Sequence, residues 1–180
     1  VKEKAHFESF FNPIVDEDNN IIGATALARN ITNRIQNENK LKISEENLQS
    51  LFDSVADAIY VLDTSGIFIN VNKSAEKMYL CSKQELIGKS CKSVAAPNLN
   101  DLDKVYKISQ EVFETGAPCT FEFWAVRKNG EIFPKEIVAT KGKYLGKNAL
   151  IATARDITER KKNERSLQKS QEKLQGIFNL

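Results

Sequence analysis

Apolar and polar residues alternate along several short segments of the chain, and this period of two is typical of β-strands. The predicted strands are residues 5–12, 21–29, 58–63, 67–72, 119–127, 131–141 and 149–155. Turn-forming residues separate neighbouring strands, most clearly at Asn129-Gly130. The first two segments predict a hairpin without partner strands, and the other five predict one sheet. Pro134, near the start of its strand, predicts a sheet edge or a bulge there.

Two long segments instead carry a spacing of three and four residues, which predicts helices from residue 30 and from residue 156. The inward positions are Ile31, Arg34, Glu38, Leu41, Glu45, Leu48 and Phe52 in the first segment, and Ile157, Arg160, Glu164, Leu167, Gln171, Leu174 and Phe178 in the second. Such a heptad seam pairs two helices, but polar residues at several inward positions weaken the pairing and its register. The pattern is compatible with exposed amphipathic linkers and with dimerising helices.

Shorter helices are predicted between the second and third strands of the five-stranded group. Asn72 caps residues 73–79, Ser82 and Glu85 form a capping box, and a helix from residue 100 or 101 ends at Gly116. The element order is therefore two strands, several helices and three strands. We expect an α+β fold: a five-stranded antiparallel sheet with short helices on one face, flanked by amphipathic linker helices.

One phrase occurs twice, as ARNITNR from Ala28 and as ARDITER from Ala154, which are 154 − 28 = 126 residues apart. The match continues to residues 54 and 180, and a period of 126 residues has the size of a domain. The repeat therefore predicts a tandem array. Its expected parts are the end of one domain (1–34), a linker or N-terminal helix (35–55), a complete domain (56–158), and a linker helix with the start of a following domain (159–180).

Charge and composition narrow the functional classes. The 26 basic and 24 acidic residues nearly balance, so charge gives no argument for a nucleic-acid partner. No apolar stretch has the length of a membrane span, and we expect no membrane contact by this segment. Three cysteines without a CxxC pair favour a reducing, cytoplasmic location.

The sequence offers no catalytic or metal-binding constellation. His6 is the only histidine, and the three cysteines are scattered along the chain, so neither a catalytic triad nor a metal cluster can be assembled. Gly88-Lys89-Ser90 matches the end of a phosphate-binding loop, but Lys83 stands where that loop needs glycine. We therefore expect that the chain itself is not an enzyme.

Four phrases in this order resemble a PAS domain, the sensory module of bacterial and archaeal signalling proteins. They are LFDSVADAIYVLDTSGIFINVNKSAEKMY, SKQELIGKS, RKNGEIF and the closing ARDITER, which cover about residues 45–160. The resemblance implies a sensor and dimerisation module, with PAS neighbours and an effector domain in the same protein and a homodimer formed through the linker helices. The implied effector is a histidine kinase, with a cyclic-dinucleotide synthase as a second candidate.

PAS domains bind haem, flavin, a small metabolite or nothing, so the resemblance leaves the ligand open. His6 lies outside the central domain, which argues against histidine-ligated haem. Cys91 falls where the flavin-binding branch of the family carries its reactive cysteine, but the neighbouring residues differ. The flavin-binding asparagines of that branch are also absent near Arg127 and Pro134. A flavin photoreceptor is therefore the least favoured function, and a small metabolite is the remaining ligand class.

Apolar strand positions are the candidates for a ligand pocket against the helices. They are Ile59, Val61, Ile69, Val71, Met78, Phe121, Phe123, Ile137, Ala139 and Ile151, with Arg127, Tyr106 and Lys92 as polar contacts. The same residues fit a fully packed core, and the chain would then be a ligand-free interaction and relay spacer. In either case we expect Asp156-Ile157-Thr158 to be the junction that passes a signal from the last strand into the following helix.

Overall fold

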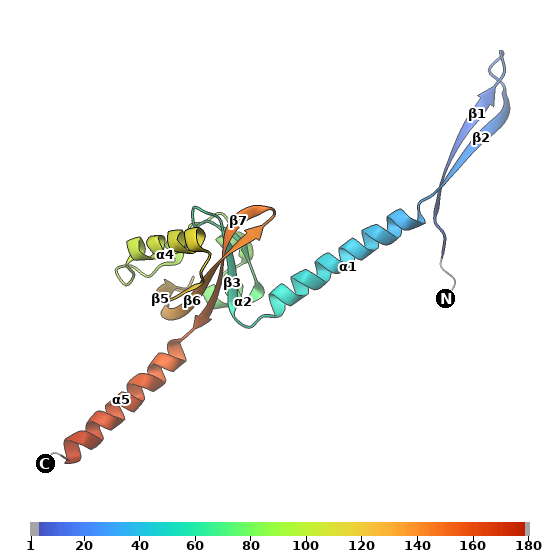
Figure 1. The fold of residues 1–180 in the computed structure, drawn as a ribbon. Coiled ribbons are helices and arrows are strands. Elements are labelled where there is room, and N and C mark those ends of the chain that lie inside the picture. Colours follow the sequence, from blue (N-terminus) through green and yellow to red (C-terminus); the bar gives the residue numbers. More distant parts are fainter. Residues whose placement is uncertain (1–3, 179–180) are drawn as a thin grey trace. The chain divides into compact units, whose positions relative to one another are not determined.

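The computed structural model describes the backbone of residues 4–178 and the side chains of residues 4–172 (Figure 1). The expected segments 1–34 and 159–180 thus extend slightly beyond the described residues, and the side chains of Leu174 and Phe178 lie outside them. The chain forms two compact units that divide after Ser50, and each is described by itself below.

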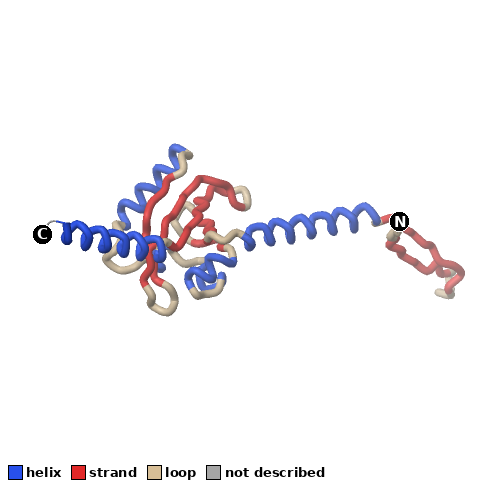
Figure 2. The backbone as a smooth tube through the Cα atoms, turned by 90° about the horizontal axis from the view of Figure 1, so that it is seen from below, coloured by secondary structure: helices blue, strands red, loops and turns tan. Residues whose placement is uncertain are grey.

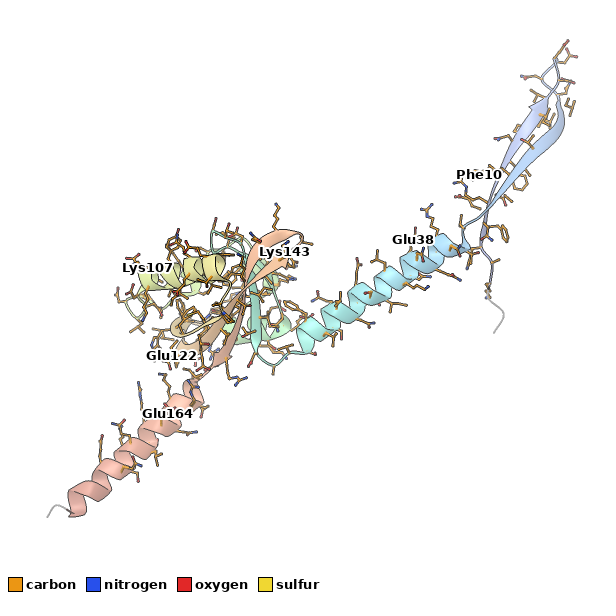
Figure 3. The ribbon with its side chains drawn as sticks, in the orientation of Figure 1. Phe10, Glu38, Lys107, Glu122, Lys143 and Glu164 are labelled. Carbon is orange, nitrogen blue, oxygen red and sulfur yellow. The ribbon has the colours of Figure 1, made fainter. Side chains whose placement is uncertain are left out.

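The first unit begins with an antiparallel hairpin of β1 (Phe7–Val15) and β2 (Ile21–Asn30), as the alternation predicts. Asp16 shapes the turn by accepting hydrogen bonds from the backbone of residues 18 and 20. These two strands form a sheet of their own within the described residues. Large apolar side chains are exposed along it, including Phe10, which Figure 3 labels. The full set is Phe7, Phe10, Phe11, Ile14, Val15, Ile21, Ile22 and Leu27.

Helix α1 (Thr32–Ser54) starts directly after this hairpin. The Asn30 side chain accepts the Thr32 N–H at 2.9 Å, which satisfies a backbone donor at the helix start. The Ile31 N–H donates to the carbonyl of His6, beside the beginning of β1, at 2.9 Å. The start of α1 is therefore fixed both by a side-chain cap and by a backbone hydrogen bond to the residue before β1.

The second copy of the phrase has the same local structure. Asp156 accepts the Thr158 N–H at 2.8 Å, and the Ile157 N–H donates to the carbonyl of Pro134 at 3.1 Å.

The strand order corrects the prediction for Pro134, which lies in an interior strand rather than at an edge. Its missing N–H costs no ladder bond, because pairing with the last strand begins only at the next residue, Lys135.

The second unit is the predicted α+β fold, with one five-stranded antiparallel sheet (Figure 2, red). The strand order is β4-β3-β7-β6-β5, so the last strand in sequence is the central strand. Their bounds are β3 (Ala58–Leu62), β4 (Phe68–Val71), β5 (Cys119–Val126), β6 (Ile132–Tyr144) and β7 (Lys147–Asp156). The helices are α2 (Lys73–Tyr79), α3 (Lys83–Leu86), α4 (Leu102–Thr115) and α5 (Thr158–Phe178), with a 3₁₀ turn at Cys91–Val94.

One face of the sheet carries the core. Tyr60 and Leu62 of β3, Phe133 and Ile137 of β6, and Ala152 of β7 are buried there and pack with residues of α2 and α4. Within the described residues, no helix combines the length and the apolar character that a membrane crossing requires.

Asn72 ties the start of this unit together. It is fully buried, and its side-chain oxygen accepts the N–H groups of Ile59 at 2.9 Å and Ala75 at 3.0 Å, the second as the predicted cap of α2. Its amide donates to the carbonyls of Phe52 at 3.2 Å and Asp57 at 3.1 Å. A single side chain thus joins the end of α1, the first strand of the sheet and α2.

Replacing Asn72 by alanine should lower the free energy of unfolding by about 2–4 kcal/mol, because the Ile59 N–H loses its acceptor and the carbonyls of Phe52 and Asp57 lose their donor. Urea unfolding followed by circular dichroism measures this change. Asn70→Ala is the matched control, since the Asn70 oxygen accepts only the neighbouring Val71 N–H. It should cost less than about 1 kcal/mol. Equal losses in the two variants would show that Asn72 does not organise the unit.

Candidate functional site

Two adjoining cavities lie between the inner face of the sheet, α4 and the 3₁₀ turn. The inner cavity has a volume of about 50 Å³ and the outer cavity about 160 Å³. They share six lining residues: Leu62, Cys91, Val105, Ser109, Phe123 and Leu150. The two cavities are therefore neighbours across these side chains. The inner cavity faces β6, and the outer cavity lies by the turn at residues 63–66 and by α4.

Lys135 of β6 is the charged residue of the inner cavity. Its side chain is only 3% exposed, and its Nζ donates a hydrogen bond to the Tyr79 hydroxyl at 2.5 Å. The rings of Tyr60, Tyr79 and Phe123 lie around Nζ, with centroids at 4.8, 5.0 and 5.2 Å. Their electron-rich faces stabilise an ammonium group, but none of them carries a full negative charge.

Burial controls ionisation at this site. It lowers the pKa of Lys135 to about 7, while the nearby Cys91 acts weakly in the opposite direction. Burial also raises the pKa of Tyr79 and of Tyr60 well above their ordinary value. The tyrosine hydroxyls therefore stay neutral at physiological pH, and Lys135 is the group whose charge can change there.

A second polar cluster connects this region to the helix α5. The Arg127 guanidinium stacks 3.8 Å from the centre of the Phe133 ring and donates to the carbonyl of Met78, next to Tyr79. It also pairs with Asp156 at 2.5 Å. Burial alone would raise the pKa of Asp156, but hydrogen bonds from Thr158 and Arg127 outweigh it, so the pKa is lowered and the carboxylate stays ionised.

The first turns of α5 are held to β5 and β6 by ion pairs. Figure 3 labels Glu122, one of the acidic partners. Lys161 pairs with Glu122 of β5 at 2.6 Å, and Arg160 pairs with Glu136 of β6 at 3.1 Å. These pairs are partly exposed, and each contributes little to stability. Ile157, by contrast, is 2% exposed and anchors the helix start in the domain. All three predicted junction residues, Asp156, Ile157 and Thr158, are thus part of one strand-to-helix connection.

Four of the ten predicted pocket residues, Phe121, Phe123, Ile137 and Ala139, line the inner cavity. Val71 and Met78 belong to the adjacent core, where the Tyr60 hydroxyl donates to the Met78 sulfur at 3.1 Å. Of the predicted polar contacts, Tyr106 and Lys92 line the outer cavity, whereas Arg127 belongs to the α5 junction.

The placement of Ile59, Val61 and Ile151 was wrong, because these residues alternate with the cavity-lining residues and lie on the opposite face of the sheet. Ile69 lines neither cavity and is the extra residue where the pairing of β3 with β4 shifts register. In β3 and β7 the residues that face the cavity are Tyr60, Leu62, Leu150 and Ala152, one position away. Ile151 instead lies over Gly142, where an added Cβ would stand 2.5 Å from its Cδ1 atom. Both faces of these strands are apolar, so the pattern does not reveal which face is inward.

Lys135 is the site residue that the sequence interpretation missed. It belongs to the period-two series of Phe133, Ile137 and Ala139, all of which are buried. Extending the alternation from Ile137 by two residues places Lys135 on the inner face. The signal was therefore present, but a lysine is normally expected on the solvent face.

The comparisons with known proteins agree with this architecture. The PAS domain family matches residues 56–159. A methyl sulfide methyltransferase-associated sensor of Methanosarcina acetivorans is 28% identical over 152 residues, covering 81% of this chain and 14% of that protein. Sporulation kinase E of Bacillus subtilis is 26% identical over 154 residues, covering 86% of this chain and 20% of that protein.

A solved structure supports the fold. The PAS domain of an HTR-like protein from Haloarcula marismortui has a TM-score of 0.61 and 24% identity, and the match covers 68% of this chain and 98% of that one. The chain spans only 14% and 20% of the lengths of the two relatives named above.

Replacing Lys135 by methionine should change how stability depends on pH. The pKa of this lysine is about 7 in the folded chain and near its ordinary value of 10.5 after unfolding, so the unfolded state binds more protons between these limits. The stability of the native chain should therefore rise relative to the methionine variant, by a few kcal/mol, as pH increases from about 7 towards 10.5. Below pH 7 the difference between the free energies of unfolding of the two proteins should not change with pH.

Urea unfolding of both proteins under reducing conditions at several pH values measures this difference. Other titrating groups cancel in the comparison of the two chains. A stability difference that stays flat between pH 7 and 10 would contradict the buried, unpaired state of Lys135.

Proposed function

Because the chain belongs to the PAS domain family, we propose that it is a cytoplasmic sensor and dimerisation module of a larger signalling protein, with a histidine kinase as effector. The kinase assignment draws on the similarity to a sporulation kinase, of which the chain matches one fifth. In this proposal the module receives a signal in its core and passes it to the helix that follows.

The contact between Arg127 and Asp156 is the observation that carries this proposal. Asp156 caps α5 through Thr158, and the same carboxylate holds Arg127, which is bonded to the end of α2 at Met78. Tyr79, the next residue, contacts Lys135 in the cavity. A shift of α2 or of the Lys135 side chain would therefore change the bonds that fix the start of α5. Such a link is a physical route for a population shift between two helix arrangements.

The two long helices supply the proposed dimer contacts. The described part of α1 has no buried residue, and Leu41 is 62% exposed although it lies on the predicted seam. Leu167, its counterpart in α5, is also 62% exposed. Apolar seam residues without a partner in their own chain are expected to pair with a second copy. The polar residues on the seam keep this pairing weak, so that the register of the two helices can change.

The repeated phrase extends the proposal to neighbouring domains. The hydrogen bond from the Ile31 N–H to the His6 carbonyl corresponds to the bond from the Ile157 N–H to the Pro134 carbonyl. The hairpin of β1 and β2 is therefore connected to its helix in the same way as the hairpin of β6 and β7. We therefore assign residues 1–34 to the end of a preceding PAS domain and residues 56–158 to a complete one. The exposed apolar residues of the hairpin would be covered by the other strands of that preceding domain.

Cysteine crosslinking tests the dimer. In a chain whose native cysteines are replaced by serine, Leu167→Cys should form a disulfide-linked dimer under mild oxidation, because this position lies on the seam. Lys169→Cys is the matched control, two residues further along the helix and off the seam, and it should crosslink at least about tenfold more slowly. Equal rates at the two positions would contradict a seam-mediated dimer.

The junction can be tested by hydrogen exchange. Asp156→Ala removes the cap of α5, worth about 1 kcal/mol, and should speed amide exchange in its first turn roughly fivefold. In the native chain, Lys135→Met should also alter amide exchange in that turn. In a chain that carries Asp156→Ala as well, Lys135→Met should have no such effect, because the contact of Arg127 with Asp156 is lost.

Asp57→Ala is the control for this experiment. It removes the ion pair of Asp57 with Arg155, the neighbour of Asp156, at 2.8 Å but leaves the cap intact. It should leave exchange in α5 unchanged. If Lys135→Met still changes α5 in the Asp156→Ala chain, the proposed route is wrong.

A further inference from the structure

Lys135 occupies the cavity without a negative partner. In the part of the chain that the structure describes, no carboxylate lies within 4.0 Å of its Nζ, and the lining of the inner cavity contains no acidic residue. Its hydrogen-bond acceptor is the neutral Tyr79 hydroxyl. An ammonium group has three donors, and a buried charge without a counter-charge is costly. The site therefore has unused capacity for an anion.

The cavity around this charge is apolar. The inner part is lined by Phe68, Val94, Phe121 and Ile137, among others, with Ser109 and Cys91 as additional polar groups. The outer part continues past Leu62 and Val105 towards Leu102 and Phe113 of α4. An occupant would thus meet Lys135 at the inner end and a largely apolar passage beyond it, with the charged residues Asp63 and Lys92 in the lining of the outer cavity.

The volumes limit the size of the occupant. At roughly 15 Å³ for each water-sized group, the inner cavity of about 50 Å³ has room for the three heavy atoms of a carboxylate. The outer cavity of about 160 Å³ leaves space for a short chain. Haem and flavin are far larger than both cavities together.

We propose that this cavity binds a short-chain aliphatic monocarboxylic acid, with its carboxylate paired to Lys135 and its hydrocarbon chain in the outer cavity. A charge-assisted hydrogen bond in a site without water is strong and short. A cationic ligand would be repelled by Lys135, and a neutral alcohol would leave the ammonium group without a counter-charge. This inference gives a ligand class to the proposed sensor and rests on that function.

The same geometry makes binding depend on pH. The titratable groups around Nζ are Tyr60, Tyr79 and Cys91, and burial keeps the two tyrosines neutral. Burial lowers the pKa of Lys135 to about 7, so the carboxylate binds the protonated lysine and draws a proton into the site when pH is higher. Affinity should be about tenfold weaker at pH 8 than at pH 6.

Binding would also act on the junction. A carboxylate that pairs with Nζ competes with the Tyr79 hydroxyl, and Lys135 stands opposite Asp156 in the pairing of β6 with β7. Tyr79 adjoins Met78, whose carbonyl is bonded to Arg127. The ligand would therefore change contacts on both sides of the residue that caps α5.

Titration of the whole chain with sodium butyrate and with butyramide tests the proposal. The two compounds have nearly the same shape, but only butyrate is charged, and binding is read from amide chemical shifts at pH 6 and pH 8. At pH 6 we expect saturable binding of butyrate at least about tenfold tighter than that of butyramide. Lys135→Met should abolish this preference while the fold, checked by circular dichroism, is kept.

Other outcomes would overturn the proposal. Equal affinity for butyrate and butyramide, no saturation below a Kd of about 10 mM, or a preference that persists in Lys135→Met would each do so. A covalent adduct of butanal with Lys135, trapped by borohydride without any preference for butyrate, would assign the site to carbonyl compounds instead. If the variant does not fold, the comparison of the two compounds on the native chain decides alone. If the titration contradicts the ligand proposal, the proposed dimer and junction still stand or fall by their own tests, which are crosslinking and hydrogen exchange.

Discussion

The pairing of β7 with both β3 and β6 is the constraint on which the rest of the structure depends. It places the last strand of the domain in the middle of the sheet, so that its residues stand between the first strand and the strand that carries Lys135. The chain leaves the sheet from this central position directly into α5. A change in the packing of either half of the sheet must therefore act on the strand from which the helix starts. Strands at the edge, such as β4 and β5, have one neighbour only.

Two buried polar residues show how differently a fold can treat such groups. Asn72 has partners for its oxygen and its amide, all supplied by the backbone around it, and its role is to hold the first elements together. Lys135 has one neutral partner and three aromatic rings. Satisfied polar groups specify a fold, while an incompletely satisfied one marks a place where stability is given up for another purpose. That contrast is the reason why we propose the cavity as the ligand-binding part of the core.

The sequence was informative wherever the two faces of an element differ. In β5 and β6 the neighbours Thr120, Glu122, Glu136 and Thr140 are polar, and the apolar residues Phe121, Phe123, Ile137 and Ala139 all line the inner cavity. The strand-to-helix connection at residues 156–158 was also predictable, since a cap and a strand end are local features. In β3 and β7 both faces are apolar, and the choice of face depends on tertiary packing that local alternation cannot reveal.

The position of Arg127 was beyond the reach of local patterns as well. Its partners, Met78 and Asp156, are 49 and 29 residues away, and only the folded sheet brings them together. Lys135 illustrates a different limit. The periodicity did place it inward, but the usual preference of lysine for solvent obscured that reading.

The recurrence of the same helix start at Asn30 and Asp156 has a consequence for how such proteins diversify. At both places the capping side chain accepts an N–H two residues further along the chain, and the N–H between them donates to the carbonyl of His6 or of Pro134. At the second place Asp156 also pairs with Arg127 of the same domain. A recombination event that joins two genes at this boundary would carry each helix start over intact. Whole sensory domains could therefore be exchanged without further mutations at the strand-to-helix connection, and a newly recombined protein would keep the start of each helix.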